Sequence, residues 1–340
     1  MKAMVIEKIV DVLQEDPLKV VEMPEPTLQE GQLLIKINAC GVCRTDLDEI
    51  EGRTAPSFYP VIPGHQVIGT IVEVKNPSKF KTGDRVGVGW IFKSCGKCSY
   101  CIEGHENLCD VFQATGRDAH GGYAEYMAAY EDFIYKIPDI FSDIEAAPLL
   151  CAGAIGWRSL RLTGAKQSGA IGLFGFGASG HIVIQIAKCL YRETKIFVFT
   201  RSEKEQALAL QLGANWAGQI TEHPPELIDV AIDTTPAWLP VLSALGNLKK
   251  GGRLVINAIR KENKDIDIMK EIKYETHLWM EKEIKSVANV GRRDIAEFLE
   301  IAANIPIKPQ ITTYSLDEAN QALKDLKTGT KAGAKVLVMD

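Results

Sequence analysis

The sequence predicts a two-domain α/β protein, and three observations support this prediction. The chain has 340 residues, whereas a single hydrophobic core rarely grows beyond about 250–300 residues. Short β-prone runs separated by turn signals fill about the first 140 residues. From about residue 170, strand and helix patterns alternate, and repeated βαβ units build a parallel sheet with right-handed crossovers.

The composition is that of an ordinary globular protein, with 46% hydrophobic and 24% charged residues. The net charge of -5 and the lack of a basic stripe give no indication of nucleic-acid binding. No apolar run reaches the roughly 18 residues that a membrane span requires. The first residues, Met1 to Glu7, lack a signal-peptide core. We therefore expect a cytoplasmic protein that acts without nucleic acid or a membrane.

The first region is predicted to be rich in strands. Residues 32–37 and 69–74 are short aliphatic runs of the strand type. The character changes near Ser142, because Ser142 and Glu145 fit a capping box that opens a helix in an Ala/Leu-rich stretch. In the second region we expect strands at 170–174, 195–199, 227–233 and 253–257, with helices around 182–187 and at 203–212. A helix at 294–303 and a strand at 334–339 close the chain.

Residues 175–180 read Gly-Phe-Gly-Ala-Ser-Gly, which is a G-x-G-x-x-G pattern between a predicted strand and a predicted helix. The first glycine permits a tight turn, the second lets the backbone approach a pyrophosphate, and the third allows close packing of helix on strand. The helix N-terminus faces the phosphates. The alternative is an ordinary βα turn. The predicted cofactor-binding residues are Gly175, Gly177, Ala178, Ser179 and Gly180.

The end of the next strand reads Phe-Thr-Arg-Ser at 199–202, and no acidic residue precedes Glu203. An acidic residue here normally binds the ribose 2′-hydroxyl of NAD. Thr200 and Ser202 can instead hydrogen-bond a 2′-phosphate, and Arg201 can pair with its charge. We therefore predict that NADP(H) is preferred and that NAD(H) is possible. The alternative is that Arg201 stacks on adenine or faces solvent.

Four of the eight cysteines lie close together in the sequence, as Cys95, Cys98, Cys101 and Cys109. Four thiolates can close a tetrahedron around one Zn²⁺ and leave no open position, so this pattern predicts a structural zinc site. The alternative, two disulfides or a redox pair, requires an oxidising compartment. A catalytic metal would need a second, open site elsewhere in the chain.

Cys43, His65 and Cys151 are candidates for that site, although each has an ordinary explanation when taken alone. His65 follows a glycine, as turn residues often do, and Cys151 lies in an apolar Leu-Leu-Cys-Ala stretch typical of small core residues. The three residues are too far apart in sequence for any spacing rule to link them.

Taken with the four-cysteine cluster and the glycine loop, these three residues resemble the zinc-dependent alcohol dehydrogenases of the medium-chain dehydrogenase/reductase superfamily. The resemblance covers essentially the whole chain. The amino-acid sequence of the glycine loop is similar to that of bacterial members acting on primary alcohols and aldehydes. It implies a GroES-like, β-rich catalytic domain at 1–152 and 289–340 that carries both zinc sites. It also implies a Rossmann cofactor domain at 153–288, an active site between the domains, and a homodimer or homotetramer.

The resemblance also implies roles for individual residues. Cys43, His65 and Cys151 would hold the catalytic zinc, a ligand set established for alcohol dehydrogenases, with the fourth position left open. Thr45 would hydrogen-bond the substrate oxygen and pass its proton outward, or else only stabilise a turn. Asp46 would orient His65, or else cap the next helix. Trp90 matches a substrate-pocket position, with core packing as the alternative.

Two positions depart from the pattern of the family. Many members have Glu after the zinc-binding His, but here the residue is the neutral Gln66. Many members end the proton path with a His three residues after the relay hydroxyl, and here that position is Asp48. A carboxylate with a reference pKa of about 3.9 is a weaker proton acceptor near neutral pH.

The resemblance implies reversible oxidation of primary or secondary alcohols to aldehydes or ketones, with two Zn²⁺ per subunit and NADP(H) or NAD(H). A polyol or aryl-alcohol dehydrogenase of the same superfamily would keep the same zinc ligands. A non-catalytic zinc- or nucleotide-binding protein is the alternative from a different class.

Overall fold

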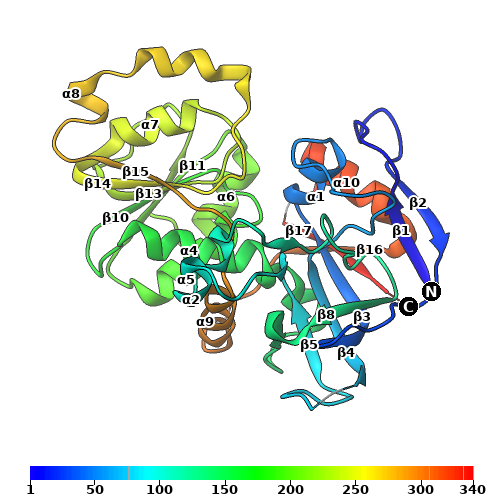
Figure 1. The fold of residues 1–340 in the computed structure, drawn as a ribbon. Helices are drawn as coiled ribbons and strands as arrows, with labels where there is room; N and C mark the ends of the chain where they lie inside the picture. Colours follow the sequence, from blue (N-terminus) through cyan, green and yellow to red (C-terminus); the bar gives the residue numbers. More distant parts are fainter. Residues whose placement is uncertain (76, 306, 332, 340) are drawn as a thin grey trace. The chain divides into compact units, whose positions relative to one another are not determined.

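The computed structural model describes residues 1–75, 77–305, 307–331 and 333–339. Two compact units share the chain (Figure 1). Unit 1 comprises Met1–Ala154, Val290–Asn304 and Lys308–Asp340, and unit 2 comprises Ile155–Asn289 and Ile305–Ile307. The chain thus leaves unit 1 after Ala154, returns to it at Val290, and passes through unit 2 once more at Ile305–Ile307. No helix among the described residues is long and apolar enough to cross a membrane.

Unit 1 is built on a seven-stranded mixed sheet whose strands run in the order β16-β17-β3-β4-β5-β9, with β8 paired to β3. The strands of unit 1 are β1 (Lys2–Ile6), β2 (Leu18–Glu22), β3 (Gln32–Val42), β4 (Gln66–Val74), β5 (Arg85–Val88), β6 (Ile91–Lys93), β7 (Gln113–Ala114), β8 (Tyr126–Tyr130), β9 (Ile134–Lys136), β16 (Ile311–Ser315) and β17 (Ala334–Val338). Its helices are α1 (Arg44–Ile50), α2 (Ser99–Ile102), η1 (Glu106–Leu108), η2 (Glu131–Phe133), α3 (Asp143–Ala146), η3 (Ala147–Leu150), α9 (Arg292–Ala303), η5 (Leu316–Glu318) and α10 (Ala319–Thr328).

The core of unit 1 forms because alternate residues of the central strands point to the same face of the sheet. Ile35 and Ile37 of β3 are buried there with Val67 and Ile71 of β4, and Leu323 of α10 joins the same cluster. The strand β3 extends five residues beyond the predicted 32–37 run. The polar and glycine positions of this extension interrupt the hydrophobic pattern from which a strand is predicted. β3 is the central strand and pairs with β4, β8 and β17.

Unit 2 contains a six-stranded, all-parallel sheet in the order β12-β11-β10-β13-β14-β15. Its strands are β10 (Ala170–Phe174), β11 (Lys195–Phe199), β12 (Trp216–Gly218), β13 (Ile228–Asp233), β14 (Leu248–Ile256) and β15 (Glu283–Ser286). Its helices are α5 (Gly180–Leu190), α6 (Glu203–Gln211), α7 (Leu239–Asn247), η4 (Asn263–Glu271) and α8 (Tyr274–His277), while α4 (Ala152–Thr163) begins in unit 1 and continues into unit 2.

The strand order confirms the predicted doubly wound fold. The order of the strands along the sheet reverses at β10, which pairs with β11 on one side and with β13 on the other. At such a reversal the loops after the two central strands diverge and leave a ligand crevice. All five residues of β10 are buried, as expected for a central parallel strand, and Phe174 stacks on Phe199 with ring centroids 4.1 Å apart.

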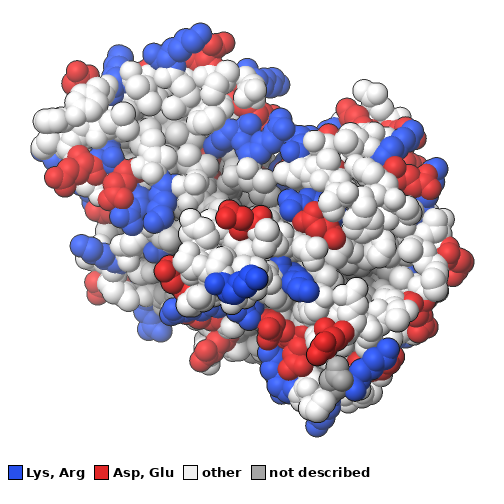
Figure 2. Space-filling view, viewed as in Figure 1, with Lys and Arg blue, Asp and Glu red and all other residues white. Residues whose placement is uncertain are grey.

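Charged side chains of both signs are interspersed over the face of the molecule shown in Figure 2. Lysine and arginine form small groups there, separated by acidic and uncharged residues, rather than one broad basic stripe. This distribution agrees with the net charge of -5.

Candidate active site and metal centres

Unit 1 brings together Cys43, His65 and Cys151, the three residues that no spacing rule could connect. Their ligand atoms all lie within 4.8 Å of one another. Cys43 Sγ is 3.2 Å from His65 Nε2, and His65 is completely buried. Bonds of about 2.3 Å to sulfur and about 2.0 Å to nitrogen place tetrahedral ligand atoms roughly 3.5–3.8 Å apart. The three side chains therefore fit one zinc ion and leave a fourth position open.

The pairing of β3 with β4 explains how Cys43 and His65 meet. These strands are antiparallel, and Gly41 pairs with Gln66. Cys43, two residues after Gly41, and His65, one residue before Gln66, consequently lie at the same end of the pair. A Cβ atom on Gly41 would come within 2.9 Å of the Gln66 side chain, so glycine is needed for this approach. Cys151 joins from the segment between η3 and α4.

Asp46 lies close to the groups that both of its predicted roles require. One carboxylate oxygen, Oδ2, accepts the backbone N–H of Cys43 at 2.7 Å and closes the capping box of α1. The other, Oδ1, lies 3.1 Å from His65 Nδ1. A carboxylate behind a metal-binding histidine fixes the orientation of the ring and leaves the far nitrogen for the metal. The buried Tyr123, which sequence reasoning missed, donates its hydroxyl to Asp46 Oδ2 at 3.1 Å.

The electrostatics of the trio favour a thiolate at Cys43. A hydrogen bond from Cys151 and the positive charge of His65 hold the pKa of the Cys43 thiol well below its ordinary value, despite burial. The backbone N–H of Thr45 also points to Cys43 Sγ, at 3.4 Å. Thiolate and imidazole are the donors that zinc prefers.

Thr45 and Asp48 lie on α1 directly after Cys43. Both are nearly buried, each with 8% of its surface exposed. Asp48 is paired with Arg53, a residue that sequence reasoning missed. Burial raises the pKa of the Asp48 carboxyl, while Arg53 opposes the rise. The ion pair with Arg53 therefore competes with any proton-accepting role for Asp48.

Trp90 follows β5 and packs in an aromatic cluster of unit 1. Its ring centroid is 5.1 Å from that of Phe112, and the Arg117 guanidinium lies 5.4 Å from the Trp90 ring. Its indole Nε1 lies 3.5 Å from Glu49 Oε1 at the far end of α1. Trp90 therefore packs in the core, as the alternative prediction stated. The polar edge of its ring faces the helix that carries Thr45.

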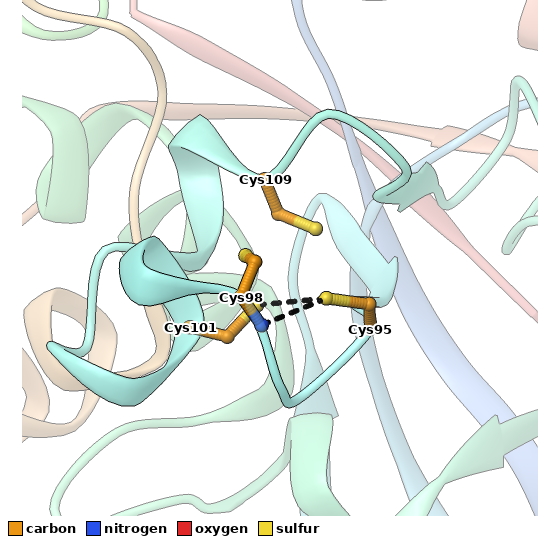
Figure 3. Close-up of side chains that lie close together, drawn as sticks. All are labelled: Cys95, Cys98, Cys101 and Cys109. Atoms are coloured by element: carbon orange, nitrogen blue, oxygen red, sulfur yellow. Dashed lines mark hydrogen bonds between the residues drawn. The ribbon is translucent and has the colours of Figure 1, made fainter.

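The four cysteines at 95, 98, 101 and 109 form a second cluster, and Figure 3 shows their side chains converging on a common point. Their sulfur atoms lie within 4.8 Å of one another. Cys98 N–H donates to Cys95 Sγ at 3.3 Å, and backbone N–H groups, that of Lys97 first, lower the pKa of the Cys95 thiol to about 6. All eight cysteines of the chain are unpaired thiols. This donor set fits a closed zinc site without a position for substrate.

The glycine loop of unit 2 has the geometry that its pattern predicts. Gly175 has φ +85°, a left-handed conformation that favours glycine. A Cβ on Gly180 would lie 2.9 Å from the Gly175 carbonyl oxygen, whereas a Cβ on Gly177 would meet no described atom within 4 Å. Open space at the second glycine is what a bound pyrophosphate requires. Ala178 and Ser179 complete the turn into α5.

The residues predicted to bind a 2′-phosphate lie at the end of β11. Arg201 is exposed there, and Ser202 caps α6 by accepting the N–H of Glu205 at 3.4 Å. Thr200 is nearly buried, and its hydroxyl donates to the Glu205 carboxylate. Glu205 was not anticipated because it lies one turn inside the helix rather than at the strand end. The structure thus places an acidic group beside the predicted phosphate ligands.

Comparison with known proteins agrees with this geometry. The model of the alcohol dehydrogenase GroES-like domain matches residues 29–139. The chain is 41% identical over 329 residues to a probable alcohol dehydrogenase, AdhA, of Mycobacterium tuberculosis, covering 95% of this chain and 93% of the relative. It is 33% identical over 314 residues to cinnamyl alcohol dehydrogenase 8 of Arabidopsis thaliana, covering 88% and 85%.

A solved structure shows the same fold. The putative zinc-binding dehydrogenase of Sinorhizobium meliloti 1021 bound to NADP superposes with a TM-score of 0.85 at 25% identity, covering 99% of this chain and 98% of that one. The predicted family, fold class and enzyme class are thereby confirmed. The chain belongs to the zinc-type alcohol dehydrogenases of the medium-chain dehydrogenase/reductase superfamily.

Proposed function

We propose that the protein reversibly oxidises primary or secondary alcohols at the Cys43/His65/Cys151 site, with NADP(H) preferred over NAD(H). The observation that carries the proposal is the convergence of three ligand atoms within 4.8 Å, with Asp46 Oδ1 3.1 Å from His65 Nδ1. A zinc ion bound there supplies Lewis-acid chemistry that lowers the pKa of an alcohol hydroxyl. A bound nicotinamide cofactor would accept a hydride from the substrate carbon, and the hydroxyl proton would leave toward solvent.

The chain's own residues prepare this reaction. Asp46 holds His65 in one orientation, and backbone N–H groups donate to Asp46 and to Cys43. Thr45 is the hydroxyl that hydrogen-bonds the substrate oxygen and receives its proton. Asp48 hands that proton to water, a role that the Arg53 pair weakens. Residues 175–180 bind the cofactor pyrophosphate through backbone N–H groups at the N-terminus of α5.

The preference for NADP(H) rests on Arg201, which is exposed directly after β11. The similar dehydrogenase of Sinorhizobium meliloti is bound to NADP, which agrees with this choice. The Thr200 hydroxyl and the position on α6 hold the Glu205 carboxylate in place. Glu205 repels a bound 2′-phosphate only if its carboxylate turns toward Arg201 and Ser202.

Aryl alcohols are a second candidate substrate class. Trp90, the predicted pocket residue, belongs to an aromatic cluster with Phe112, and such rings favour flat apolar ligands. A relative that covers most of the chain is named cinnamyl alcohol dehydrogenase 8. The same zinc ligands would serve aliphatic and aryl alcohols alike.

We infer that copies of the chain associate through β15, giving a homodimer or, with a further contact, a homotetramer. β15 pairs with β14 alone in the described sheet, and its four residues are exposed. Antiparallel pairing of two copies about Ile284, which is 44% exposed, would place Glu283 of each chain opposite Lys285 of the other. A mass in solution of a single chain would refute this inference.

We also place the reaction in the cytoplasm. Six of the eight unpaired cysteines lie in the two metal clusters. Thiols bind zinc only while they stay reduced, which the cytoplasm ensures.

The test of the proposed function is a panel of primary, secondary and aryl alcohols, with the matching aldehydes and ketones, assayed with NADP(H) and NAD(H). Metal analysis of the same preparation is part of the test. We expect two zinc ions per chain and alcohol-dependent reduction of NADP⁺. A folded protein that holds two zinc ions and turns over no member of the panel would contradict the proposal.

A further inference from the structure

Glu49, in the last turn of α1, is a buried carboxylate without a counter-charge. Its relative exposure is 0%, and its Oε2 atom has no hydrogen-bond partner among the described residues. Its Oε1 atom has one contact, with Trp90 Nε1 at the long distance of 3.5 Å. No lysine, arginine or histidine of the described chain forms an ion pair with Glu49, whereas its neighbours Asp48 and Glu51 are both paired with Arg53.

Glu49 lies beside the open metal site. It is three residues after Asp46 on α1, a spacing that places both side chains on one face of the helix. Burial raises the pKa of the Glu49 carboxyl well above its ordinary value. The negative charges of Asp46 and Cys43 act in the same direction, and the positive charge of His65 opposes them. Glu49 thus lies on the face of α1 that carries Asp46, whose Oδ1 atom is 3.1 Å from His65 Nδ1.

An isolated buried charge is costly, and folded proteins retain one where it is paired or placed next to a metal ion. At Glu49 the chain offers no cation, but Cys43, His65 and Cys151 offer a place for a divalent one. Gln66, directly after His65, cannot supply a negative charge near the metal site, because its side chain is a neutral amide. Gln66 is 2% exposed.

We propose that Glu49 is a positioning residue for the metal ion of the Cys43/His65/Cys151 site, acting through its charge rather than as a ligand. It provides from α1 the negative charge that Gln66 does not provide from β4. Glu49 does not belong to the group whose ligand atoms lie within 4.8 Å of one another, which fits an indirect role. This inference rests on the proposed function, because it takes that trio to be a zinc site.

The first test measures how fast zinc leaves the protein in the presence of a chelator. In Glu49→Gln we expect zinc from the Cys43/His65/Cys151 site to leave about 10–100-fold faster, the range typical when a group behind a metal ligand is removed. Zinc from the four-cysteine cluster should leave at the unchanged rate, which provides a control within the same molecule. The exposed Glu300→Gln is the matched surface control.

A compensating variant distinguishes a charge effect from general damage. Gln66→Glu places a carboxylate directly after His65, so the double variant Glu49→Gln with Gln66→Glu should recover slow zinc release. Unchanged release in Glu49→Gln would overturn the proposal. Faster release that the double variant fails to correct would also overturn it, because the loss would then come from packing.

The thermal midpoint gives a second readout that does not depend on catalysis. In zinc-free protein, Glu49→Gln removes a buried carboxyl group that has no counter-charge and should raise the unfolding midpoint by about 2–4 °C. In zinc-loaded protein this gain should disappear, because the charge then has its partner. Equal shifts with and without zinc would contradict the proposal. These measurements do not read turnover, so a protein inactive on all alcohols would refute the proposed function and leave the metal test valid.

Discussion

The contact between Thr200 and Glu205 shows how one side chain can alter a cofactor prediction made from sequence. The strand-end motif Thr-Arg-Ser lacks an acidic residue and therefore indicates NADP(H). The structure adds Glu205, which accepts the Thr200 hydroxyl from one turn inside α6. The proposed 2′ subsite thus contains an exposed guanidinium and a restrained carboxylate, and we expect their balance to determine the cofactor preference.

We expect Arg201→Ala to lower kcat/KM for NADP⁺ by about 10–100-fold and to change kcat/KM for NAD⁺ little, because a charge-assisted hydrogen bond is worth about 1.5–3 kcal/mol. Glu205→Gln should shift the ratio in the opposite direction, toward NADP⁺. Steady-state kinetics with both cofactors and one saturating alcohol measure this ratio. A wild-type enzyme that prefers NAD⁺, or an Arg201→Ala variant that loses both cofactors equally, would disprove the assignment.

Sequence identified many site residues but not the way they pair. Asp46 was expected either to orient His65 or to cap a helix; one of its oxygen atoms caps α1, and the other lies 3.1 Å from His65 Nδ1. Asp48 was expected at the end of a proton path, and the structure pairs it with Arg53. Contacts such as those of Tyr123 and Glu49 leave no trace in spacing, because they depend on side chains that meet only after folding.

At the scale of elements, strands with strong local signals were predicted well. The strands at 170–174 and 195–199 coincide with β10 and β11. β14 begins at Leu248 rather than near 253, because the Gly251–Gly252 pair resembles a turn but is accommodated where the register with β13 shifts. β15 was missed, since an exposed edge strand of four residues carries no hydrophobic pattern.

The helix α10 offers a pH-dependent test of stability in unit 1. Asp325 is nearly buried and accepts hydrogen bonds from Tyr314 Oη at 2.7 Å and Gln321 Nε2 at 2.8 Å, and Lys331 Nζ lies 2.9 Å away. The Tyr314 hydroxyl, with Lys331, holds the pKa of the Asp325 carboxyl well below its ordinary value. A lowered pKa in the folded state stabilises the fold above the unfolded-state pKa, and this stabilisation is lost as the pH falls.

We therefore expect Asp325→Asn to destabilise the protein by about 1–3 kcal/mol near pH 7. The difference between the thermal midpoints of wild type and variant should stay constant from pH 8 to about pH 5 and should narrow at about pH 4 and below. Asp317→Asn, which breaks the exposed pair with Lys2, is the control and should shift the midpoint little. A gap that widens as the pH falls would contradict this account.

At the scale of the whole molecule, the sequence predicted the fold class and both metal sites, but by different routes. The cysteines at 95–109 are recognisable from local spacing alone. The open site was predicted only through resemblance to a family, from Cys43, His65 and Cys151. These residues are distant in sequence, and a strand pairing and the start of a distant helix bring them together. The local spacing of cysteines thus predicts the closed four-cysteine cluster, whereas long-range contacts form the open Cys43/His65/Cys151 site.

This difference leads to the central claim, that the open trio performs the chemistry and the four-cysteine cluster stabilises unit 1. The measurement that tests it most directly compares Cys151→Ser with Cys101→Ser by zinc content, thermal midpoint and alcohol-dependent NADP⁺ reduction. Cys151→Ser should lose one zinc and its turnover while the four-cysteine zinc remains. Cys101→Ser should lose the other zinc and melt at lower temperature, but its folded fraction should retain turnover. A Cys101→Ser protein that is folded, keeps zinc at Cys43, His65 and Cys151, and yet has no turnover would contradict the account.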